Sequence, residues 1–138
     1  MGMKISGFLN LILVAVTLVG VAFSADSQSL ITVPKRFREE LPGIFVWNMA
    51  TSEKRSFGVG MKLSWLAMMN DNRRLIGGMF DGKIRVWDIR SEKLMATLPG
   101  HRTRVSTIAV SPDDSKLASG SMASEALIWD ATKLPKVK

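Results

Sequence analysis

His101 is the only histidine of this 138-residue chain, so it is the only side chain with an ordinary pKa suited to general-base catalysis near neutral pH. Such catalysis would need a nucleophile or an acid nearby. Asp113 and Asp114 could form a pair of carboxylates, but they follow Ser-Pro in a segment typical of a hairpin turn. We therefore expect no catalytic residue in this chain.

Cysteine is absent, which excludes disulfides, thiolate zinc sites and a cysteine nucleophile. With a single histidine, one copy of the chain cannot build a metal site of several histidines. The Gly77-Gly78 pair is not followed by the Gly-Lys-Ser/Thr of a phosphate-binding loop. We expect neither a metal nor a cofactor.

Positive charge is the strongest compositional signal, with 19 Lys and Arg against 12 Asp and Glu and a net charge of +7. Lys62 and Arg104 lie 42 residues apart at equivalent places in the pattern described below, and Arg102 is close to the second. Dispersed solubilising charge is the interpretation we favour for these three residues; the alternative is a candidate partner surface for acidic peptides, anionic polymers or lipids. Nucleic acid is not expected, because aromatic residues do not alternate with the basic ones.

Residues 1–24 have the three parts of a secretory signal peptide, which are Lys4, an apolar run over 11–23 and small residues at Ala22 and Ser24. This pattern predicts cleavage after Ser24 and an exported protein, periplasmic or secreted. An uncleaved membrane anchor over residues 5–23 is one alternative. Myristoylation at Gly2 is a weaker one.

The rest of the chain divides into a polar lead-in arm over 25–43, an apolar and turn-rich region over 44–132, and a tail over 133–138. We expect an edge strand at Leu30–Val33 within the arm. From Ile44 onward, short apolar runs alternate with turn signals such as Asp81-Gly82 every eight to twelve residues. This pattern predicts an all-β fold.

Trp47, Trp87 and Trp129 are separated by 40 and 42 residues. Each follows Val or Ile and precedes Asn or Asp. A shift of 42 residues also aligns further pairs, which are Leu63 with Val105, Ala67 with Ala109, Asp71 with Asp113, Leu75 with Leu117 and Gly78 with Gly120. The chain therefore contains an internal repeat of about 42 residues.

A repeat of this length that opens with Gly100-His101 and closes with Trp129-Asp130 resembles the WD-repeat family of β-propellers. The segment DGKIRVWD over 81–88 is nearly as similar, and the resemblance covers residues 44–132. It implies an incomplete propeller of four-stranded antiparallel blades, with about two and a half blades. It also implies a non-catalytic scaffold that binds one or more protein partners, with the loop containing Lys62 on a face that often binds them.

Many members of this family lock each blade with a hydrogen-bonded set of histidine, serine or threonine, aspartate and tryptophan. By the resemblance, His101, Thr107 and Trp129 match three positions in the later repeat, and Ala123 stands at the aspartate position. The earlier repeat has only Asp81 and Trp87 of the set. The resemblance therefore implies incomplete networks and blades that depend on apolar packing.

Propellers close with about four to eight blades, which this chain does not supply. The expectation we favour is that the chain is the first part of a longer product. Head-to-tail association of copies through open blade faces and a marginal remnant are the alternatives. Two further functions follow from them, an accessory propeller portion of a larger envelope enzyme and a self-assembling structural protein.

Overall fold

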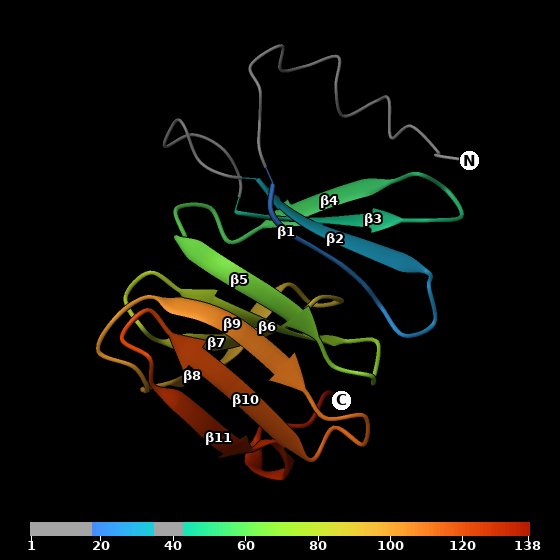
Figure 1. Ribbon diagram of the computed structural model, residues 1–138. Helices are drawn as coiled ribbons and strands as arrows, with labels where there is room; N and C mark the ends of the chain where they lie inside the picture. Colours follow the sequence, from blue (N-terminus) through green and yellow to red (C-terminus); the bar gives the residue numbers. More distant parts are fainter. Residues whose placement is uncertain (1–17, 35–42) are drawn as a thin grey trace, which may run out of the picture.

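The computed structural model describes residues 18–34 and 43–138, and within these ranges the chain forms eleven strands, one 3-10 helix and no α-helix. The strands make three antiparallel sheets that follow one another along the chain (Figure 1). Sheet 1 contains β1 (Leu18–Phe23), β2 (Ser29–Pro34), β3 (Ile44–Asn48) and β4 (Lys54–Phe57). Sheet 2 contains β5 (Leu63–Met68), β6 (Arg74–Met79), β7 (Ile84–Asp88) and β8 (Lys93–Leu98). Sheet 3 contains β9 (Val105–Val110), β10 (Lys116–Ser121) and β11 (Ala126–Asp130), and the 3-10 helix η1 (Ala131–Lys133) follows it.

The three repeated tryptophans confirm the all-β prediction, because each lies on the third strand of its own sheet. Each also faces an equivalent leucine on the second strand, since Trp47 pairs with Leu30, Trp87 with Leu75 and Trp129 with Leu117. In all three sheets, strands that are consecutive in the sequence are hydrogen-bonded neighbours. The repeat seen in the sequence is therefore a repeat of one sheet.

The first sheet is larger than the sequence predicted. The resemblance implied only half a blade before residue 60, yet β1 and β2 join β3 and β4 in a four-stranded sheet. The strand expected at Leu30–Val33 exists, but it lies inside the sheet between β1 and β3 rather than at its edge. The physical reason is that the end of the apolar run forms a strand of its own, so β2 pairs with β1 on one side and with β3 on the other.

Only the end of the signal helix predicted over residues 1–24 lies in the described part, and there the structure has a strand instead. Leu18–Phe23 end the apolar run that was assigned to the signal segment, and they form β1, which pairs with β2. Residues 1–17 lie outside the described part of the chain. Within that part, no helix is long and apolar enough to cross a lipid bilayer.

Most of the core lies in two layers between successive sheets, and a smaller third cluster in sheet 1 consists of Leu30, Phe45 and Trp47. One layer joins sheets 1 and 2 and includes Ile31, Ile44, Leu75 and Trp87, all of them nearly inaccessible to solvent. The other joins sheets 2 and 3. Its members include Ile76, Ile84, Val86, Val105 and Leu117. The first strands of the three sheets run side by side, since β1 contacts β5 and β5 contacts β9.

At one end of the sheets, a turn in sheet 2 and the equivalent turn in sheet 3 are each hydrogen-bonded to the preceding sheet. Asn72 and Asp114 occupy equivalent turns and have the positive φ angles, 62° and 59°, that Asn and Asp tolerate better than most residues. The Asn72 side chain accepts a hydrogen bond from the backbone of Asp26 in sheet 1 (2.8 Å). The Asp114 side chain accepts one from the backbone of Asn70 in sheet 2 (2.9 Å). These turns therefore fix the sheets in succession.

Candidate functional site

Lys62 and Arg104 lie at the opposite end of the sheets from those turns, each just before the first strand of its sheet. The backbone carbonyl of Lys62 accepts a hydrogen bond from Phe80 (3.0 Å), and that of Arg104 accepts one from Met122 (3.1 Å). These equivalent bonds tie both cations to the strands behind them. Both side chains are exposed, as is that of Arg102, so the structure places the three predicted residues on the surface of one end.

Exposed apolar side chains gather beside these cations. Phe80 is 48% exposed, Trp65 40% and Val59 70%, although large apolar side chains are usually covered. Two hollows, of about 500 and 670 Å³, adjoin there, and both are lined by Met61, Lys62 and Phe80. We call this region the Phe80 surface; it consists of Val59, Met61, Lys62, Trp65, Phe80, Leu94 and Arg104.

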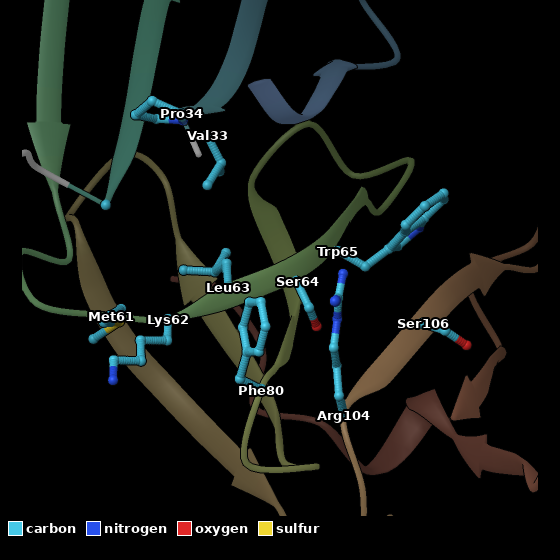
Figure 2. A pocket seen from close by; sticks show the side chains of 11 residues that line it. Val33, Pro34, Met61, Lys62, Leu63, Ser64, Trp65, Phe80, Arg104 and Ser106 are labelled. Carbon is cyan, nitrogen blue, oxygen red and sulfur yellow. The ribbon is translucent and has the colours of Figure 1, made fainter. Parts of the chain in front are cut away.

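The smaller hollow lies where the three sheets meet. Its lining includes Val33 and Pro34 from sheet 1, Leu63 and Trp65 from sheet 2, and Arg104 from sheet 3. In Figure 2, Met61 and Lys62 lie at one side and Trp65 and Ser106 at the other, with Phe80 and Arg104 between them. The guanidinium carbon of Arg104 lies 4.4 Å from the centre of the Phe80 ring, which is a cation–π contact.

The charge of this end is not balanced locally. Among residues 18–34 and 43–138, no carboxylate lies within ion-pair distance of Lys62, Arg102 or Arg104. The neighbouring carboxylates already have partners, since Asp81 lies 3.6 Å from Arg85 and Glu125 lies 3.5 Å from His101. The Phe80 surface is therefore apolar and positively charged at once.

His101 belongs to a buried hydrogen-bonded chain inside sheet 3. Its side chain has no exposed area, and its Nε2 lies 2.8 Å from the hydroxyl of Ser119. That hydroxyl also accepts the indole N–H of Trp129 (3.0 Å). On the other side of the ring, Nδ1 faces a carboxylate oxygen of Glu125 at 3.5 Å, too long for a well-formed hydrogen bond. The Ser119 hydroxyl, with one proton and two lone pairs, accepts the indole N–H of Trp129 and joins it to Nε2 of His101.

This hydrogen-bonded set corrects one prediction. Thr107, expected to supply the hydroxyl, lies exposed on β9, and Ser119 on β10 supplies it instead. The network was also expected to lack its carboxylate because Ala123 stands at the aspartate position. Glu125, two residues later in the same turn, lies 3.5 Å from Nδ1 without forming a hydrogen bond, so the network is incomplete. His101 is thus a structural residue of sheet 3.

The equivalent positions in the other sheets differ. In sheet 1, the indole of Trp47 donates to Thr32 (3.2 Å), as Trp129 does to Ser119. In sheet 2, the position of Ser119 is occupied by Gly77, where an added Cβ would lie only 2.5 Å from the ring of Trp87. The ring of Trp87 therefore fills the space that a hydroxyl side chain occupies in the other two sheets. Asp81 hydrogen-bonds its own turn, at the backbone of Lys83, rather than Trp87.

Sequence reasoning missed Ser119 because it assigned the hydroxyl by distance along the chain. The signal that could have found it is the strand register. Ser119 pairs with Leu127 and Thr32 with Phe45, and in both sheets the tryptophan follows two residues after that partner. In these two sheets, the Ser or Thr that pairs with the residue two positions before the tryptophan therefore accepts the indole N–H.

We predict that Ser119→Ala lowers the free energy of unfolding by about 1–3 kcal/mol, because it leaves the indole N–H of Trp129 and Nε2 of His101 without a partner. Urea unfolding followed by tryptophan fluorescence measures this loss. Thr107→Ala is the matched control and should change the free energy by less than about 0.5 kcal/mol, because Thr107 is exposed. Equal losses in the two variants would contradict the assignment of Ser119.

Asp88, directly after Trp87, has a strongly shifted pKa. Burial favours its neutral form, but the side chain of Arg73, the backbone N–H of Arg90 and the hydroxyl of Ser91 all donate to the carboxylate and hold its pKa at about 2. The Arg73 contact is bidentate, with distances of 3.2 and 2.5 Å. Asp88 thus joins two turns of sheet 2 at the end remote from the Phe80 surface. In the described part of the chain, no group of three or more acidic, histidine or cysteine residues is placed to hold a metal ion.

Comparison with known proteins identifies the repeats. The family described as "WD domain, G-beta repeat" matches residues 60–88 and 92–130. A curated relative, Protein ROOT INITIATION DEFECTIVE 3 of Arabidopsis thaliana, is 32% identical over 120 residues, which cover 86% of this chain and 26% of the relative. Guanine nucleotide-binding protein subunit beta-5b of Danio rerio is 44% identical over 57 residues, covering 41% of this chain and 14% of that protein. The chain thus spans about a quarter or less of these two relatives.

Solved structures agree with the sequence relatives. A chain in the structure titled "Crystal Structure of Mitotic Checkpoint Complex" superposes with a TM-score of 0.72 and 25% identity. The match covers 90% of this chain and 38% of that one. The three sheets therefore have the arrangement of successive blades in a larger protein.

Proposed function

The chain belongs to the WD-repeat family of β-propeller proteins, and on that premise we propose that it is a non-catalytic scaffold that binds a protein partner through the Phe80 surface. The observation that carries the proposal is the exposure of Trp65 and Phe80 beside Arg104, on a surface hollowed where three sheets meet. Trp and Arg are the residue types most enriched among those that dominate protein–protein binding energy.

Two further observations support a binding role over a catalytic one. His101 is buried and hydrogen-bonded within sheet 3, so it is not presented to a substrate. The names of two similar proteins describe parts of assemblies, because one is a guanine nucleotide-binding protein subunit and the other belongs to a mitotic checkpoint complex. The buried histidine and these similar proteins both favour a binding role, in agreement with the exposed aromatic and basic side chains of the Phe80 surface.

Site-specific photo-crosslinking tests the proposal. A photoreactive phenylalanine is placed at position 80 or position 62, and at Thr51, an exposed turn residue at the other end of sheet 1, as the control. In cells that make the chain, we expect the same adduct from positions 80 and 62 and none from Thr51. Absence of an adduct at position 80, or the same adduct at Thr51, would contradict the proposal.

A further inference from the structure

We propose that the Phe80 surface recognises an acidic peptide segment in which a carboxylate lies next to an apolar side chain. This inference rests on the proposed function and names the chemistry of the partner. Arg104 would bind the carboxylate, and the hollow between the sheets would take the apolar side chain.

Arg104 is positioned in advance for a carboxylate. One face of its guanidinium lies on the ring of Phe80, at 4.4 Å, while no described carboxylate occupies its N–H groups. Its backbone is fixed by the bond from Met122 and by the following residue, Val105, which is fully buried. A stacked guanidinium keeps its edge free for two parallel hydrogen bonds to a carboxylate, and less side-chain entropy is lost on binding.

The hollow beside Arg104 suits an apolar side chain. Val33, Pro34, Met61 and Leu63 contribute to its lining, and Trp65 stands at its far side from Lys62 (Figure 2). At about 500 Å³ the hollow is larger than one side chain, so a short stretch of peptide fits it. An arginine beside an aromatic-lined hollow matches the composition of binding hot spots.

Charge selects an acidic partner over a neutral one. Lys62 and Arg102 add two exposed cations without a described carboxylate within ion-pair distance. Nucleic acid fits the same charge less well. A phosphate backbone needs a row of cations along a groove, whereas the hollow has mainly apolar walls and a single stacked guanidinium.

Fluorescence anisotropy with the full chain tests this proposal. The probe is a fluorescein-labelled, amidated ten-residue peptide with two glutamates flanking a leucine in a Gly/Ser background. Its analogues replace both glutamates by glutamine, or the leucine by serine. We expect each analogue to bind about tenfold more weakly, because one loses the charge-assisted bonds and the other the apolar contact.

Variants localise the effect. Arg104→Gln should weaken the glutamate peptide about tenfold and remove the preference for glutamate over glutamine. Arg90→Gln is the matched control, with an expected change below about twofold, because Arg90 is exposed in the turn after β7, at the other end of sheet 2. Circular dichroism verifies that both variants fold.

Several results would overturn the inference. They are no binding of the glutamate peptide, equal binding of the glutamate and glutamine peptides, equal losses in the two arginine variants, or tighter binding of an oligothymidylate that Arg104→Gln abolishes. The scaffold proposal is judged separately, by the crosslinks. Adducts at positions 80 and 62 without discrimination among peptides would leave the scaffold standing and remove the acidic-peptide chemistry.

Discussion

Replacing Trp87 by alanine should lower the free energy of unfolding by about 3–5 kcal/mol, close to the whole stability of a marginal domain. Trp87 is 1% exposed and lies in the layer between sheets 1 and 2. Its ring also occupies the space beside Gly77, so neighbouring side chains would have to move far to fill the cavity. Urea unfolding monitored by far-ultraviolet circular dichroism measures the loss without relying on the deleted fluorophore.

Trp65→Ala is the matched control for this prediction. It removes the same side chain from a strand of the same sheet, but from a half-exposed position on the Phe80 surface. We expect a change of less than about 1 kcal/mol there. If the two variants lost similar stability, the packing role assigned to Trp87 would be wrong.

Asp88→Asn should lower the free energy of unfolding at pH 7 by about 2 kcal/mol. The folded pKa of Asp88, about 2, lies below its ordinary value of 3.8, so the folded state favours the ionised carboxylate. The stabilisation is therefore complete above about pH 5, declines as the pH falls through 3.8, and is lost near pH 2. The difference between wild type and variant should follow this course.

Urea midpoints at pH 7, 4 and 2.5 measure that course. Asp113 also has a pKa of about 2, so wild type and variant share its titration, and only their difference reports on Asp88. Asp81→Asn is the control, since Asp81 is exposed in a turn of the same sheet and asparagine keeps the acceptor for the backbone N–H of Lys83. We expect it to leave the midpoints nearly unchanged. A pH-independent difference for Asp88→Asn would contradict the ion-pair explanation.

Local sequence signals predicted sheets 2 and 3 well, because there the alternation of apolar runs and turns coincides with the tryptophan repeat. Asp81-Gly82 does form a turn, with a φ of 83° at the glycine, whose carbonyl oxygen accepts a hydrogen bond from the backbone N–H of His101 (3.2 Å). The positions of Lys62 and Arg104 on one end also followed from the repeat alone. Short-range patterns were sufficient where each strand lies within a full copy of the 42-residue repeat.

Sheet 1 could not be predicted in the same way. The residues of β1 have the composition of an export segment, and only pairing with β2 distinguishes them as a strand. The Phe80 surface depends on contacts between sheets, such as the stacking of Arg104 on Phe80, which no local pattern encodes. Glu125 was missed because the turn brings it to His101 from a position two residues beyond the expected one.

The position of β1 links proteolytic processing at the amino terminus to solubility. Export with cleavage after Ser24 remains a prediction, and it would separate β1 from the rest of sheet 1. Ser24 itself is 3% exposed and bonds Asp26 and Ser29, whereas Ala25 on the other side of this peptide bond is exposed. A chain trimmed there would present the N–H and C=O groups of β2 as an open edge, which is a template for aggregation. Cleavage at this bond would thus lower the solubility of the remaining sheet unless another strand covers β2.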